Sequence, residues 1–123
     1  MSNGGCACSG GPKLIFACSG AADVGEIADR AARQLSREGA GKMFCLAGIG
    51  GRVAVILKTT EAASAILAID GCSLNCAKSS LEQGGFTNFK HLQLADLGME
   101  KGKTPATEGS IDRVVARGRQ LLN

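Results

Sequence analysis

The amino-acid sequence predicts an α/β domain, a three-layer αβα sandwich built around a four-stranded, mainly parallel sheet. Two observations support this prediction. Short apolar runs that are typical of buried strands alternate along the chain with amphipathic stretches of helical spacing. Glycine, which makes up 18 of the 123 residues, repeatedly stands where one such segment ends. This alternation favours right-handed crossovers and a parallel sheet that helices cover on both faces.

The first half of the chain is predicted to contain two strands, each followed by a helix. Residues 14–18 form a short apolar run that is typical of a buried strand. Apolar residues then recur at helical spacing from Val24 to Leu35, which predicts the first helix. Residues 43–47 form a second apolar run, and the alanine-rich residues 54–64 favour a helix over part of their length.

The second half of the chain continues this alternation. Residues 66–70 are apolar up to their last residue and predict the third strand. Ser73 is expected to cap a helix over residues 74–83. Residues 89–95 predict the fourth strand, and Ser110 is expected to begin a C-terminal helix. Strands linked in this way predict the order 2-1-3-4, as in flavodoxin-like and other Rossmann-like folds.

Length and composition place these elements in one domain. Of the 123 residues, 45% are hydrophobic and 20% are charged, as is usual for a globular protein. We expect a single domain over residues 13–123, preceded by a flexible glycine- and serine-rich tail over residues 1–12. No secretory signal is visible, and no apolar run approaches the ~20 residues of a membrane-spanning helix. The sequence therefore predicts a cytoplasmic protein that does not bind membranes.

Charge and aromatic content argue against nucleic acid as a partner. The formal net charge is +3, the basic residues are scattered, and aromatic residues make up 3% of the chain. A nucleic-acid-binding surface would need clustered Lys and Arg together with aromatic side chains for base stacking. The partner that the sequence does indicate is a metal ion, and it identifies no protein partner.

Six cysteines in a chain without a visible secretion signal favour metal binding or thiol chemistry over a disulfide framework. Four of them lie near, at or just beyond the carboxyl ends of predicted strands: Cys18, Cys45, Cys72 and Cys76. The carboxyl ends of parallel strands share one edge of the sheet, where ligands bind at the point of strand-order reversal. We therefore expect these four thiols to lie close together.

Thiolates at this edge are suited to hold a soft metal ion. The helices expected after Cys18 and Cys72 point their positive N-terminal ends at the edge, which favours thiolate over thiol. Sulfur ligands select zinc or, as a second choice, an iron–sulfur cluster over magnesium or calcium. Two other interpretations stay open. The cysteines are small core residues, or they serve a thiol-based redox enzyme or a sulfur or electron carrier.

The segments around these cysteines resemble a known family. Asp70-Gly71-Cys72 resembles the Asp-Gly-Cys motif that gives the DGC family its name. Further segments of resemblance are residues 18–25, 45–50, 73–78 and 96–102. The resemblance runs from about residue 13 to the C-terminus and implies a zinc-binding protein with the four cysteines named above as ligands. It implies no particular reaction, so the sequence assigns no enzymatic activity.

Other polar residues are candidates for supporting roles. Asp70 ends an apolar strand, and its carboxylate is expected to accept backbone N–H groups of the following turn. Alternatively Asp70 would bind the metal directly or, together with Ser73, would hydrogen-bond to the metal ligands. Cys6 and Cys8 in the tail are accessory candidates for closing over the site or binding metal. His91, the only histidine, lies inside a predicted strand and is expected to be structural.

Two glycine-rich segments are similar to phosphate-binding loops but do not match them. Residues 48–51 lack the third glycine and the acidic partner of a dinucleotide-binding fingerprint, so we expect a turn there. Residues 98–104 have three residues between their glycines, one fewer than a phosphate-binding loop requires. Lys101 and Lys103 are therefore expected to form a solvated rim, which near the cysteines would steer anions.

Overall fold

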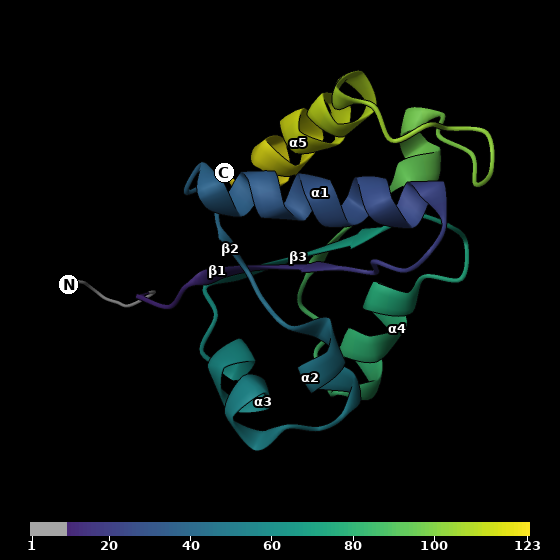
Figure 1. Cartoon of the computed structure of the whole chain (residues 1–123). Coiled ribbons are helices and arrows are strands. Elements are labelled where there is room, and N and C mark those ends of the chain that lie inside the picture. The colour runs from purple at the N-terminus through teal and green to yellow at the C-terminus, as the bar shows by residue number, and fades with distance from the viewer. Residues whose placement is uncertain (1–9) are drawn as a thin grey trace.

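In the computed structural model, which describes residues 10–123, helices lie on both faces of a parallel sheet (Figure 1). Cys6 and Cys8, with the rest of the predicted tail up to residue 9, lie outside the described residues. The strands are β1 (Lys13–Ala17), β2 (Lys42–Met43), β3 (Ala65–Asp70) and β4 (Lys90–Gln93). The helices are α1 (Asp23–Arg37), α2 (Leu46–Gly50), α3 (Ala54–Glu61), α4 (Cys76–Gln83), the 3-10 helix η1 (Leu94–Leu97) and α5 (Glu108–Leu122).

The strands pair in the order β2-β1-β3-β4, and every pair is parallel. The longest pairing joins β1 to β3, from Lys13 opposite Ala65 to Ala17 opposite Ile69. The strand order reverses at this pair, because the chain leaves β1 toward β2 on one side and returns to β3 on the other. The predicted fold class, parallel sheet and strand order are confirmed.

Helices α1 and α5 cover one face of the sheet, and α2, α3 and α4 cover the other (Figure 1). Side chains of β1 alternate between these layers, since Ile15 packs with α1 and α5 whereas Leu14 and Phe16 pack on the opposite face. All three are fully buried, as the apolar run predicts. No helix within residues 10–123 combines the length and apolar character needed to cross a membrane.

The predicted second strand is largely wrong. β2 ends at Met43, and α2 follows, although residues 43–47 predict a strand and residues 48–51 a turn. A Cβ at Gly48 would lie 2.7 Å from Cγ1 of Ile56, so glycine allows α2 to pack closely against α3. None of residues 43–47 is fully buried, so this short apolar run indicates neither a strand nor full burial.

Two helices begin at residues other than the predicted ones. α4 starts at Cys76, and Ser73 does not cap it, because the chain turns through the left-handed conformation just before the helix. α5 starts at Glu108, where the hydroxyl of Thr107 accepts the N–H of Ser110 at 3.2 Å. Ser110 thus lies inside the first turn of α5. β4 is shorter than predicted, because the chain tightens into η1 directly after it.

Candidate functional site

Three of the four predicted ligand cysteines line one cavity. Cys18 directly follows β1, Cys72 follows β3, and Cys76 begins α4. The cavity has a volume of about 600 Å³ and lies at the carboxyl edge of the sheet, between β1 and β3. The point of strand-order reversal therefore carries three thiols that come from two separate parts of the sequence.

Cys18, like Cys72, is partly buried. Its Sγ accepts the backbone N–H of Gly71 at 3.3 Å, which links the end of β1 to the turn after β3. Burial raises the pKa of the Cys18 thiol, and the charges of Asp70, Cys72 and Cys76 act in the same direction, while the Gly71 N–H opposes them. Without a cation, Cys18 is therefore held as a thiol near neutral pH.

Cys45 lies apart from these three thiols. It is exposed, just before α2, and lines a neighbouring cavity of about 720 Å³ with Arg33 and Arg37 of α1. Ser19 lines both cavities. In this conformation no three Cys, His, Asp or Glu side chains of residues 10–123 converge closely enough to hold a metal ion. The role of Cys45 as a fourth ligand stays a prediction.

The exposure of the thiols bears on their interpretation as core residues. Cys18 and Cys72 are partly buried at the rim of the core that packs beneath α1, and Cys45 and Cys76 are exposed. Cysteines that serve only as small core residues are usually fully buried. The accessibility of these four side chains favours a chemical role for them.

Asp70 is fully buried and binds the start of α4. Its two carboxylate oxygens accept the backbone N–H groups of Ala77 at 2.8 Å and Lys78 at 3.0 Å. These groups belong to the first turn of the helix, so Asp70 replaces the capping side chain that Ser73 does not provide. Nε2 of His91 lies 2.8 Å from Oδ2 of the same carboxylate, within hydrogen-bond distance.

Gln93, at the end of β4, stabilises the turn after β3 through hydrogen bonds from its side chain. Its side-chain amide donates to the backbone carbonyl of Cys72 at 3.3 Å and to Oδ1 of Asn75 at 2.6 Å. Asn75 adopts the left-handed conformation with φ of 54°. Sequence reasoning did not identify Gln93, because its role depends on the pairing of β4 with β3. The turn that presents Cys72 and Cys76 is thus fixed from two sides.

Two glycines allow the segments around the cavity to approach each other. A Cβ on Gly71 would lie 2.6 Å from the carbonyl oxygen of Val24, and a Cβ on Gly25 would lie 2.5 Å from that of Ser19. Both contacts are with backbone, which cannot move aside as a flexible side chain can. The glycine of the Asp-Gly-Cys motif therefore serves to bring the turn after β3 against the first turn of α1.

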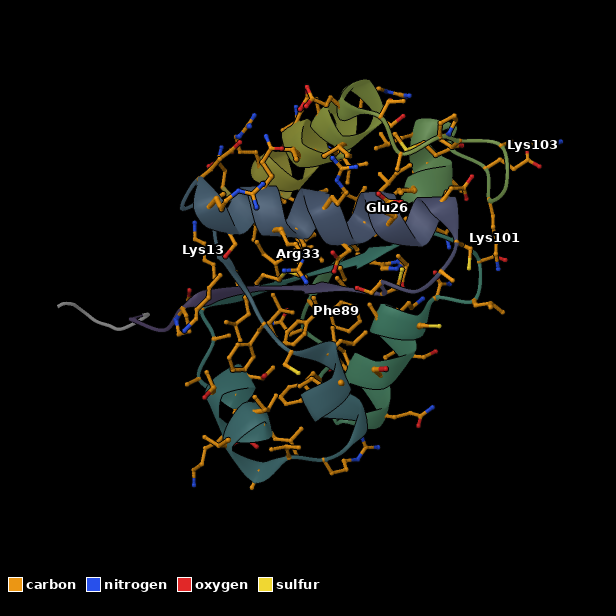
Figure 2. The ribbon with its side chains drawn as sticks, in the orientation of Figure 1. Lys13, Glu26, Arg33, Phe89, Lys101 and Lys103 are labelled. Atoms are coloured by element: carbon orange, nitrogen blue, oxygen red, sulfur yellow. The ribbon has the colours of Figure 1, made fainter. Side chains whose placement is uncertain are left out.

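The loop between η1 and α5 borders the same cavity, and Asp23 anchors it. The carboxylate of Asp23 accepts the backbone N–H of Gly102 at 2.9 Å and of Thr104 at 3.1 Å. These two hydrogen bonds lower the pKa of Asp23. Lys101, which precedes the first anchored amide, lines the cavity together with the cysteines. Figure 2 shows Lys101 and Lys103 on this loop, with Lys103 directed outward.

Acid is expected to weaken the anchor of this loop. Because the pKa of Asp23 is lowered in the folded state, its contribution to stability is complete above about pH 4, its unfolded pKa, and is lost as the pH falls through the lower folded value. Amide exchange of Gly102 and Thr104, measured by NMR, should be slow in the parent protein and fast in Asp23→Ala. Asp29→Ala, on the same helix, is the control, and unchanged protection in Asp23→Ala would contradict the anchor.

Comparison with known proteins is consistent with these features. Residues 14–117 match the family model of the DGC domain, which spans β1 to α5 and contains the four described cysteines. The anaerobic and virulence modulator AnvM of Pseudomonas aeruginosa is 36% identical over 88 residues, which cover 72% of this chain and 67% of AnvM. No solved structure matches the chain.

Proposed function

The chain belongs to the DGC domain family, and from that premise we propose that it binds zinc through cysteine thiolates at the carboxyl edge of the sheet. The observation that carries the proposal is the single cavity lined by Cys18, Cys72 and Cys76. Cys45 is proposed as the fourth ligand, from the neighbouring cavity. The cytoplasm is the compartment we propose, because it keeps such thiols reduced.

The chemistry of the donor set fits zinc. Sulfur ligands are soft, and Cys-rich sites bind zinc with bonds of about 2.3 Å. Each cysteine side chain turns about one bond, so rotation of Cys18, Cys72 and Cys76 inside their shared cavity would bring the sulfurs toward a common point. Cys45 would have to move farther, and it belongs to a segment without regular secondary structure, residues 44–45.

The surrounding residues hold the thiols in place. The Gly71 N–H orients Sγ of Cys18, and Asp70 fixes the helix start that carries Cys76. Four bound thiolates would close the site and make zinc structural, whereas three would leave a position at which zinc acts as a Lewis acid. Because each ligand must lose its proton, metal binding releases protons and weakens as the pH falls.

Metal content of the untagged full chain, purified under reducing conditions without added metal, tests the proposal. We expect about one zinc ion per chain by elemental analysis, with the ligand thiols shielded from titration until a chelator is added. Cys72→Ser and Cys45→Ser should each abolish most of the bound zinc if both cysteines are ligands. Cys6→Ser is the matched control and should have a much smaller effect.

The outcomes separate the ligand sets. Loss of zinc in Cys72→Ser but not in Cys45→Ser would exclude Cys45 as a ligand and leave the open site of three thiolates. If the analysis found iron together with inorganic sulfide, the bound group would be an iron–sulfur cluster and not zinc. A folded chain without metal, in which all thiols titrate freely, would overturn the zinc proposal.

Dithiol chemistry is the second candidate function. Negative charge on Cys72 or Cys76 would raise the pKa of the Cys18 thiol. Each of these two thiols therefore lies close enough to Cys18 for their charges to interact. A pair of such thiols would form a disulfide by passing two electrons to an oxidant and losing two protons. Thiol titration before and after mild oxidation, on metal-free protein, distinguishes this function from zinc binding.

A further inference from the structure

Lys101 adds a positive charge to the lining of the cysteine cavity, and metal binding by the thiols does not require that charge. Of the described residues lining this cavity, Lys101 is the only basic one. It also lines an adjoining cavity of about 590 Å³, and both cavities share Gly71, Cys72 and Leu74. Among residues 10–123 no carboxylate lies within 4.0 Å of its ammonium group. Lys101 therefore lines the same cavity as the three thiols and has no ion-pair partner in the described part of the chain.

We propose that this cavity binds a small thiol-reactive molecule that carries a carboxylate, with Lys101 as the residue that selects the anion. The inference rests on the second candidate function in one respect, namely that these cysteines react as free thiols in the metal-free protein. Asp70 and any ionised thiol in the cavity would repel an anion, and Lys101 offsets that repulsion. A single ammonium matches a single negative charge, which favours a carboxylate over a doubly charged phosphate.

The side chains that line the cavity restrict the chemistry of the part of the ligand that lies between its two ends. Val24 and Ala22 form an apolar side from the start of α1, and Leu74 adds a second apolar side chain that is 70% exposed. A ligand with a short apolar body between its carboxylate and its thiol-reactive end would contact Lys101, Leu74 and the thiols together.

Lys103 provides a matched control on the same loop. Its ammonium lies 3.6 Å from Oε2 of Glu100, both side chains are largely exposed, and Lys103 does not line the cavity. Removal of either lysine changes the net charge of the protein by the same amount. An effect confined to Lys101 would therefore report its position beside the thiols and not the total charge.

Iodoacetate and iodoacetamide test the proposal on metal-free, reduced full-length protein. In both reactions the thiolate sulfur forms a bond to carbon and iodide leaves, but iodoacetate carries a carboxylate and iodoacetamide is neutral. Peptide mapping by mass spectrometry gives the rate at each cysteine. We expect the iodoacetate-to-iodoacetamide rate ratio at Cys72 to fall about threefold to tenfold in Lys101→Gln, the size expected when an ammonium that contacts the carboxylate of the reagent is lost.

The controls decide between a local effect and a general one. Lys103→Gln should leave the ratio at Cys72 unchanged, and Lys101→Gln should leave it unchanged at Cys45, which lines a different cavity. Raising the salt concentration should reduce the ratio of the parent protein toward that of Lys101→Gln. An equal ratio in parent and Lys101→Gln would overturn the proposal, as would a Cys72 that neither reagent modifies. Zinc content, measured separately, tests the proposed function alone, so the two can fail independently.

Discussion

Gly71→Ala is expected to destabilise the fold by about 3 kcal/mol, the upper range for forcing an added methyl group into a packed interior. The new Cβ would lie 2.6 Å from the carbonyl oxygen and 2.7 Å from the carbonyl carbon of Val24, so either α1 or the turn after β3 must shift. That shift would also lengthen the hydrogen bond from Gly71 to Cys18. Thermal unfolding should show a midpoint lowered by about 12 °C.

Gly109→Ala is the matched control for this substitution. A Cβ at Gly109, in α5, would have only the hydroxyl oxygen of Thr107 nearby, at 3.9 Å. An alanine there should be neutral or stabilise the helix by up to about 1 kcal/mol. If the two variants unfolded at the same temperature, the close approach of the two segments would be wrong. If Gly71→Ala folded normally but lost zinc, the effect of the glycine would lie in the site rather than in the fold.

The position of the cysteine edge follows from sequence pattern because it depends on strand polarity alone. Cys18 and Cys72 end or follow apolar runs that become β1 and β3, and the alternation with helices makes those strands parallel. Their side chains then share a cavity whatever the details of the loops. Cys45 depends on a strand that is only two residues long, so its placement relies on packing that the pattern does not describe.

Side chains that join segments far apart in sequence could not be predicted in the same way. The pairing of Asp70 with His91 requires the register in which Asp70 lies opposite Gln93, which places His91 two residues earlier on the same face of the sheet. The anchor from Asp23 to Gly102 joins the first residue of α1 to a loop that has no periodic pattern. In each case the sequence shows a polar residue within an apolar segment or at its end. Such a residue indicates a buried hydrogen-bond partner but does not identify it.

Asp70→Ala is expected to destabilise the fold by about 4 kcal/mol, the cost of removing one member of a buried, hydrogen-bonded pair. The carboxylate is fully buried and accepts two backbone N–H groups of α4, and no other side chain of the described residues caps that helix. His91→Ala should cost only about 1 kcal/mol, since it removes one hydrogen bond and its side chain is partly exposed. Urea unfolding of each variant measures both values.

A double-mutant cycle separates the two contributions of Asp70. If His91 acts only through Asp70, the double variant Asp70→Ala/His91→Ala should be no less stable than Asp70→Ala, which gives a coupling energy of about 1 kcal/mol. The control for loss of a negative charge is Asp96→Ala, because Asp96 is an exposed aspartate on η1. This substitution should change stability by less than about 0.5 kcal/mol.

Because α4 carries Cys76 at its first position, Asp70→Ala should also fray the helix start that presents this thiol. A Cys76 whose alkylation rate is unchanged in folded Asp70→Ala would show that the helix start is held by other contacts.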